Sequence, residues 1–410
     1  MIIHNQKECP VCGNSEIRCA WTLNGLPITE RLAMPGTDYH SKEAITVQQS
    51  LSYCQECTHS FLDAVVDPPY LYAPADYRTI SSNSKASLDA LERFTSLIRS
   101  AVNKFTIHGE RDNIILIDIG SNDSTLLKLL EHDFNSFIGI DPLPKHPSEF
   151  SKPLQLYPNL CDKFDFGTLE NLNTTRVFVS SHTLEHVASP RNFFESLQKH
   201  TTTSDLFVFQ FPSLECLIQF GRYFQVHNQH LQYFSVRSFE RLLSDFDFTL
   251  LQYSFDRNHY GALQVVFKKA GANGLTRPIV TTPPRIEYSQ LVSGIKRFER
   301  SAQYFDSMIA DYQSSIVGYG AGLMFPIVCF HYQSIRELKY VIDNNTSKIG
   351  IRYLGTQAEV ISIERLNEFD LVIVCTFPSE GAYRSSVSRL IEHKECLENE
   401  FDIFLPFLTL

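Results

Sequence analysis

Short apolar runs, polar turns and longer amphipathic stretches follow one another along this 410-residue chain. The first long apolar run, residues 114–119, is rich in β-branched side chains and is broken only by Asp118. Such a run is typical of a strand that is buried on both faces of a parallel sheet. Strands of this kind that alternate with helices predict an α/β protein with a Rossmann-like sheet. Further strands are expected at 137–140, 175–180, 205–212, 249–255 and 263–268.

Changes in the pattern divide the chain into segments. Residues 270–284 are rich in Gly, Thr and Pro and form the clearest boundary. After a helix expected over 286–312, a second Rossmann-like unit opens at 315–322 and has strands at 338–342, 359–361 and 371–375. The expected order is an N-terminal domain at 1–65, a linker and helix at 66–107, a central domain at 108–272 and a C-terminal Rossmann-like domain at 285–410.

The turn after the first strand indicates a nucleoside site. Gly120 allows a tight turn close to a ligand, and the polar residues after it can cap a helix. Asp141 ends the next strand, where a carboxylate can accept hydrogen bonds from both ribose hydroxyls. A dinucleotide would need more glycines, so S-adenosylmethionine fits better, and an ordinary βα turn is the alternative. The expected cofactor site comprises Asp118, Gly120, Ser121, Asn122, Asp123, Asp141, Pro142, Ser181 and His182.

Two CxxC pairs near the N-terminus predict a metal site. Cys9 and Cys12 form the first pair, and Cys54 and Cys57 form the second. Four thiolates on two turns match a closed tetrahedral Zn²⁺ site, which is structural because no coordination position is open. A redox-active pair and chance spacing are the alternatives. The long insert between the pairs must be folded and includes a strand near 45–50.

Polar residues gather after two later strands. His182 and the Glu185-His186 pair follow the strand at 175–180, at the edge of an open α/β sheet where ligands bind. The segment 221–235 contains His227, Gln229 and His230, and burying so many polar groups requires partners. A histidine there can act as a general base. For His186 the alternative is a histidine that packs against or caps a helix. For the segment 221–235 it is a zinc-binding or surface loop, although no carboxylate or cysteine accompanies its two histidines.

Composition excludes some classes of function. The net charge of −10 argues against a nucleic-acid partner. No apolar run has the length of a membrane span, and the first residues lack the pattern of a signal peptide. The ten cysteines are paired as CxxC or scattered, which indicates a metal site and buried thiols in a reducing cytoplasm. We therefore expect a cytoplasmic protein with no membrane partner; its oligomeric state is open.

Taken together, these segments resemble a known family, the three-domain C-methyltransferases that act on nucleotide-linked deoxysugars in bacteria. The resemblance covers nearly the whole chain. It rests on the CxxC pairs, the Asp118-Ile-Gly-Ser-Asn-Asp loop and the His182-x-Leu-Glu185-His186 segment. It also rests on Tyr77 with the serines that follow it, the segment 230–235 and the glycine-rich turn 318–322.

The resemblance implies a zinc-binding domain, a central S-adenosylmethionine domain and a C-terminal domain that helps to hold the sugar nucleotide, with the segment at 66–107 contributing to the active site. It implies that a base removes the proton beside a sugar ketone and that the resulting enolate attacks the methyl group. His230 matches the family's general base, and His182 and Tyr77 match residues that support it. The expected catalytic residues are His230, His182, Tyr77, Gln229 and His227. The product would enter a surface polysaccharide or a natural product such as an antibiotic.

The chain departs from the family at several positions. The family's Tyr-His-Glu-His loop is His227-Asn-Gln229-His230 here, and Gln229 lacks the charge that would raise the pKa of a neighbouring histidine. Ser124 and Tyr260 stand where the family has glycine. These differences leave open a hydroxyl or amine acceptor on a related sugar. Two further hypotheses are an NAD(P)-dependent oxidoreductase that uses Asp343 in the C-terminal unit and a non-catalytic zinc-ribbon binding module.

Overall fold

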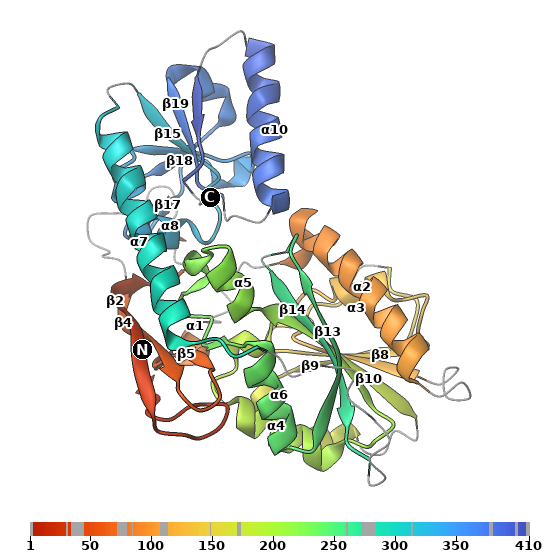
Figure 1. The fold of residues 1–410 in the computed structure, drawn as a ribbon. Helices are drawn as coiled ribbons and strands as arrows, with labels where there is room; N and C mark the ends of the chain where they lie inside the picture. Colours follow the sequence, from red (N-terminus) through yellow and green to blue (C-terminus); the bar gives the residue numbers. More distant parts are fainter. Residues whose placement is uncertain are drawn as a thin grey trace.

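A computed structural model describes residues 3–29, 32–33, 45–71, 80–83, 85–106, 114–147, 149–169, 174–259, 261–271, 284–312, 315–376, 380–397 and 401–406. Within these residues the strands form a central and a C-terminal seven-stranded sheet, a four-stranded sheet and a two-stranded ribbon. Figure 1 shows the central unit beside the N-terminal strands, with the C-terminal unit at the other end of the molecule. The α/β fold with two Rossmann-like sheets is therefore as predicted.

The central sheet has the strand order β13-β14-β11-β10-β7-β8-β9, and β14 runs in the opposite direction to the other six strands. Every residue of β7 is buried, as expected for a strand covered on both faces. From β7 the chain winds outward through β8 and β9 and then returns to β10 on the other side, so the order reverses between β7 and β10. The strands are β7 Ile114–Ile119, β8 Ser136–Asp141, β9 Leu154–Pro158, β10 Thr175–Ser181, β11 Leu206–Pro212, β13 Phe248–Asp256 and β14 Ala262–Lys269.

Helices cover both faces of the central sheet (Figure 1). One buried cluster packs α2 Lys85–Phe105 and α3 Thr125–Leu129 on the sheet, and α4 Pro190–His200 and α6 Val236–Asp245 pack on the other face. The side chain of Ser235 caps α6 by accepting a hydrogen bond from the Ser238 amide. Shorter helices of this part are α1 Pro68–Leu71, η2 Ser81–Asn83, η4 Cys161–Lys163, η5 Phe166–Leu169, η6 Leu184–His186, α5 Leu214–Gln219 and η7 Tyr223–Gln225.

The N-terminal segment forms an antiparallel sheet of order β12-β5-β4-β2. Three of these strands are β2 Ile17–Pro27, β4 Thr46–Cys54 and β5 Ser60–Leu62, and the fourth, β12 Gln232–Tyr233, comes from the central unit. The pairing of β12 with β5 thus joins the loop before β12 to the sheet that carries the cysteines. The two-stranded ribbon pairs β1 Ile3–Asn5 with β6 Ala64–Val66.

The C-terminal sheet has the order β20-β19-β15-β16-β18-β17-β3. Its last strand, β3 Leu32–Ala33, belongs to the N-terminal segment and pairs with β17. The other strands are β15 Ile316–Tyr319, β16 Tyr340–Ile342, β17 Arg352–Tyr353, β18 Glu359–Ile361, β19 Leu371–Val374 and β20 Asp402–Phe404. The helices of this unit are α7 Tyr288–Ala310, α8 Phe325–His331, α9 Gln333–Arg336, η8 Thr346–Lys348, η9 Ile363–Glu368 and α10 Glu380–Leu397.

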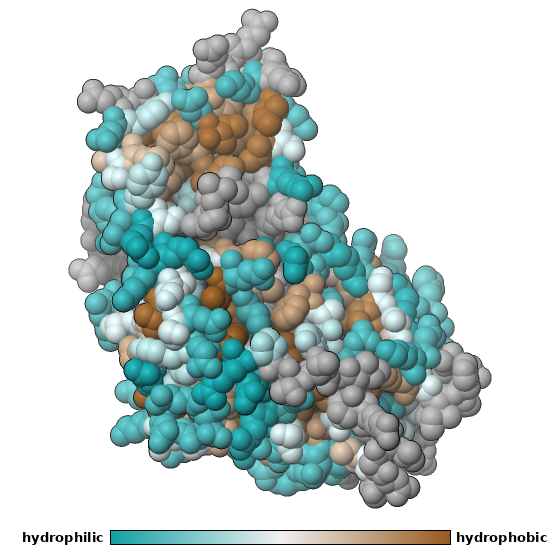
Figure 2. Space-filling view, viewed as in Figure 1, coloured by the Kyte–Doolittle hydropathy of each residue, from teal (hydrophilic) through white to brown (hydrophobic). Residues whose placement is uncertain are grey.

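Helix α7 connects the C-terminal unit to the N-terminal sheet (Figure 1). Trp21 of β2 contacts Phe298 of α7 and stacks on His331 of α8, and its indole nitrogen donates a hydrogen bond to Glu299 at 2.8 Å. Most of the face in Figure 2 is hydrophilic, and apolar side chains gather over the C-terminal unit. Among the described helices, none combines the length and the apolar character that a membrane crossing requires.

Candidate functional site

A cavity of about 630 Å³ lies at the carboxyl ends of β7, β8, β10 and β11, beside the point where the strand order reverses. Its size falls within the usual range for small-molecule sites, and its position is the one where open α/β sheets bind ligands. Its walls come from the central unit, from the segment around α1 and α2, and from the C-terminal unit. Lining residues of the last two groups include Pro68, Ser81, Ser87, Leu91, Gly322, Met324, Phe325, Lys348 and Cys375.

Gly120 lies where the loop after β7 packs against the loop after β10. It has a φ of +84°, and a Cβ atom there would lie 1.9 Å from the Thr183 hydroxyl oxygen in the loop after β10. Only glycine is tolerated at this position. Any other residue would be strained at this φ, and its side chain would collide with the loop after β10. The backbone of the first loop therefore forms the cavity wall itself.

The Asp141 carboxylate accepts hydrogen bonds from the backbone of the loops after β7 and β8. One carboxylate oxygen accepts a hydrogen bond from the Asn122 amide at 3.0 Å, and the other accepts one from the Leu143 amide at 2.8 Å. Burial raises the pKa of Asp141 in spite of these bonds. Each oxygen keeps further acceptor capacity toward the cavity, which is the property that binding a ribose requires.

The structure brings together six of the expected cofactor residues. Gly120, Asn122, Asp141, Pro142, Ser181 and His182 line the cavity. Asp118, Ser121 and Asp123 are not among the lining residues. Asp123 instead accepts hydrogen bonds from the Thr125 hydroxyl at 2.7 Å and from the Ser82 amide at 3.0 Å, which connects the loop to η2.

Asp118 lies within β7 and is 2 % exposed. One of its carboxyl oxygens has no hydrogen-bond partner among the described residues. Burial, together with the charges of Asp141 and Asp123, raises its pKa to about 8. The side chain is consequently protonated at neutral pH.

Histidines from three segments line the other half of the cavity. His182 follows β10, His186 ends η6, and His227 and His230 lie on the loop before β12; His259 lies beside His182, at 4.8 Å between ring centroids. The rings of His227 and His230 are 3.9 Å apart, and those of His186 and His230 are 5.1 Å apart. Burial lowers the pKa of His227 to about 3, and burial and the neighbouring histidines lower the pKa of His230 well below its ordinary value. Both rings are therefore neutral at pH 7.

Among these histidines, His182 is hydrogen-bonded to a carboxylate. Its Nδ1 lies 3.1 Å from the Oε1 atom of Glu185, three residues further on. Because a carboxylate can only accept, Nδ1 carries the proton and Nε2 carries the lone pair. That Nε2 atom is buried and has no hydrogen-bond partner in the described part of the chain. This pairing is the arrangement that orients a general base.

The side chains of the loop at 227–230 differ in their contacts: three of them line the cavity, and Asn228 contacts the N-terminal segment. Asn228 points away from the cavity: its amide donates to the carbonyls of Leu26 and Pro27 at 3.2 and 3.1 Å and accepts a bond from Gln49. Gln229 lines the cavity, and its backbone carbonyl accepts a hydrogen bond from Nδ1 of His186 at 2.8 Å. Tyr77, also expected in the catalytic group, lies outside the described residues.

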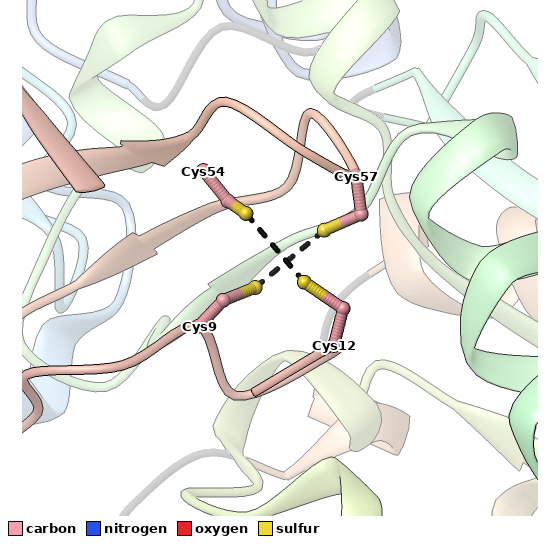
Figure 3. Close-up of side chains that lie close together, drawn as sticks. All are labelled: Cys9, Cys12, Cys54 and Cys57. Atoms are coloured by element: carbon pink, nitrogen blue, oxygen red, sulfur yellow. Dashed lines mark hydrogen bonds between the residues drawn. The ribbon is translucent and has the colours of Figure 1, made fainter. Parts of the chain in front are cut away.

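The four expected metal ligands converge (Figure 3). The sulfur of Cys9 is 3.5 Å from that of Cys57, and the sulfur of Cys12 is 3.6 Å from that of Cys54. These distances are close to the separation of about 3.8 Å between sulfurs on a tetrahedral Zn²⁺ ion. Both contacts join one CxxC turn to the other, and all four sulfurs lie within 4.8 Å of one another, as a shared metal requires. The cluster fits structural zinc.

Some residues of the site were missed from sequence. Lys348 reaches the cavity from the C-terminal unit, and its amine contacts the Ala321 carbonyl at 2.8 Å and the Asp343 carboxylate at 3.0 Å. Asp343, the expected ribose ligand of a second nucleotide site, is thus paired with a lysine. His259 also lines the cavity. The i, i+3 spacing of His182 and Glu185 was the one sequence signal that could have identified their pairing.

Comparison with known proteins also indicates a methyltransferase. Residues 91–253 match the family described as a methyltransferase domain, and this span contains β7, β8, β10 and most of the cavity's central wall. Over 335 residues the chain is 19% identical to the C-methyltransferase NovU of Streptomyces niveus, an alignment that covers 78% of this chain and 77% of the relative.

Solved structures are similar over about half of the chain. One is a putative S-adenosylmethionine-dependent methyltransferase from Listeria monocytogenes, with 13% identity, a TM-score of 0.33 and coverage of 44% of this chain and 100% of the other. Another is the 1,6-didemethyltoxoflavin-N1-methyltransferase of Burkholderia thailandensis, with 15% identity, a TM-score of 0.34 and coverage of 58% and 100%.

Proposed function

We propose that this S-adenosylmethionine-dependent methyltransferase methylates a carbon beside the carbonyl group of a nucleotide-linked sugar, with His182 as the base. The observation that carries the proposal is the hydrogen bond between His182 and Glu185 at the end of β10, with Nε2 of His182 buried at the cavity. The distant relative that is a C-methyltransferase supports the same chemistry.

The cofactor half of the cavity fits S-adenosylmethionine. The backbone around Gly120 can approach the methionine part because no side chain occupies the space beside Thr183. The carboxylate of Asp141 accepts the ribose hydroxyls in addition to the backbone amides that it already holds. When bound there, S-adenosylmethionine supplies an electrophilic methyl group.

The acceptor would occupy the half of the cavity that is lined by the histidines and the C-terminal unit. This half offers a cation for the phosphates of a nucleotide-linked sugar. The amine of Lys348 has three donor hydrogens, and two of them are accounted for by Ala321 and Asp343. The third is available for a phosphate oxygen at the wall that the C-terminal unit forms. This placement sets the nucleotide against the C-terminal unit and the sugar against the histidines.

The reaction then follows from the groups that the chain supplies. Nε2 of His182 takes the proton from the acceptor carbon, and the Glu185 carboxylate stabilises the imidazolium that forms. The electron pair left on the acceptor, delocalised onto its carbonyl oxygen, forms the bond to the methyl carbon as the bond from sulfur to that carbon breaks. The resemblance alone favoured His230 as the base, but position 229 is a glutamine and gives His230 no carboxylate partner.

The test compares cofactor binding with turnover. We expect His182→Gln to bind S-adenosylhomocysteine with unchanged affinity by calorimetry and to lose about 10²–10⁴-fold in kcat on a panel of nucleotide-linked keto sugars. Asp141→Ala should lose the binding itself. The exposed His132, which follows α3 and does not line the cavity, provides the matched control: His132→Ala should change neither value.

Isotope exchange separates the proposed chemistry from transfer to a hydroxyl or amine. In ²H₂O with S-adenosylhomocysteine bound, the wild-type protein should exchange the proton on the acceptor carbon, and His182→Gln should not. A product methylated on oxygen or nitrogen, or full turnover by His182→Gln, would overturn the proposal.

A further inference from the structure

We propose that Glu185, His186 and His230 bind a divalent transition-metal ion inside the cavity, at a site separate from the four cysteines. One ligand atom from each of these residues lies within 4.8 Å of the others. The two segments that supply them are held together by the backbone, because the Leu231 amide donates a hydrogen bond of 2.7 Å to the Glu185 carbonyl. All three residues line the cavity.

Glu185 gives the strongest indication of a cation site. Its side chain is 1% exposed, and its Oε1 atom faces Nδ1 of His182. Its Oε2 atom is buried and has no hydrogen-bond partner among the residues that the structure describes. A buried carboxylate oxygen without a partner is costly, and a metal ion placed between it and the two imidazoles removes that cost.

The two histidines are already held in the form that binds a metal. Nδ1 of His186 donates to the backbone carbonyl of Gln229 at 2.8 Å, so the lone pair of this ring is on Nε2. His230 makes a hydrogen bond to the backbone of Gln225, while its buried Nδ1 has no partner among the described residues. A metal-binding histidine usually donates its second ring nitrogen to a carbonyl or carboxylate, and both rings meet this condition.

The donor set identifies the class of metal. Two imidazoles and one carboxylate suit Zn²⁺, Fe²⁺, Co²⁺ or Mn²⁺ and leave open coordination positions. Ligands on opposite sides of such an ion stand about 4.2 Å apart, so the widest pair would move inward slightly on binding.

An open coordination position next to His182 would allow the metal to take part in the reaction. There it would polarise the carbonyl oxygen of the acceptor and stabilise the charge that develops when His182 removes the proton. This role rests on the proposed function, but the site itself does not.

The test counts metal ions and identifies their ligands. The metal-depleted full-length protein is titrated with Co²⁺. We expect two equivalents, one with the intense near-ultraviolet bands of cobalt bound to thiolates and one with the weak visible bands of nitrogen and oxygen ligands. In His186→Ala the second equivalent should disappear while the thiolate bands remain, and in Glu185→Gln it should bind more than tenfold more weakly.

His259→Ala is the matched control, because His259 is in the same cavity but not in the ligand group; it should retain both equivalents. A wild-type protein that binds only the thiolate equivalent, or a His186→Ala variant that still binds two, would overturn the proposal. Because the readout needs neither substrate nor turnover, a failure of the proposed function would leave this result unchanged.

Discussion

Asp118 is an acid in the middle of a strand whose residues are all buried. The free acid avoids the cost of a buried charge, and this is why its pKa rises to about 8. In the unfolded chain the same group titrates at its ordinary value of 3.8. Between these two values the folded state holds a proton that the unfolded state releases, so this residue lowers stability as the pH rises.

We therefore expect Asp118→Asn to stabilise the protein in a pH-dependent way. Its advantage in free energy of unfolding should grow from pH 5 to pH 8 by up to about 1.4 kcal/mol per pH unit and then level off. Urea unfolding at several pH values measures the difference. Glu131→Gln is the control: hydrogen bonds from Lys128 and Ser151 hold the pKa of Glu131 below its ordinary value, and its charge is not among those that raise the pKa of Asp118. Its effect should be a loss of stability that stays constant over this range.

At the scale of elements, the cofactor half of the site is the junction between the loops that follow β7 and β10. We expect Gly120→Ala to weaken binding of S-adenosylhomocysteine at least tenfold, because its Cβ would lie 1.9 Å from the Thr183 hydroxyl and its φ is +84°. Calorimetric titration is the measurement. Gly322→Ala is a matched control in the same cavity, because a Cβ there meets no atom within 4 Å. Equal affinities of the two variants would contradict this account of the junction.

The elements also show which parts of the fold could be predicted. The long helix α2 is strongly amphipathic, and β7 is an apolar run broken only by Asp118, so both could be located from sequence. Asp141 and the cysteines have informative spacing, and the S-adenosylmethionine-dependent methyltransferase fold was confirmed. The strands β3 and β12 have two residues each, too few for any period, and both join a sheet of another unit. Contacts across units, such as Lys348 at the cavity, likewise have no local pattern.

At the scale of the whole molecule, these two short strands and the stack of Trp21 on His331 hold the units together. The ring centroids of the stack are 5.4 Å apart and the planes are nearly parallel, at 17°. Nε2 of His331 is buried and has no hydrogen-bond partner in the described part of the chain. Burial lowers the pKa of His331 to about 3, so the contact between the N-terminal sheet and α8 contains a neutral histidine.

This contact should respond to acid. An unfolded histidine binds a proton near pH 6.5, whereas folded His331 stays neutral down to about pH 3, so the stability is fully present above pH 6.5 and is lost as the pH falls. We expect His331→Phe, which keeps a ring on Trp21, to reduce the loss of stability between pH 6 and pH 4 by up to about 1.4 kcal/mol per pH unit. Urea unfolding of the variant and of the exposed-site control His132→Gln measures this slope. If both variants lose stability as steeply as the wild-type protein, folding does not lower the pKa of His331, and burial does not keep this ring neutral.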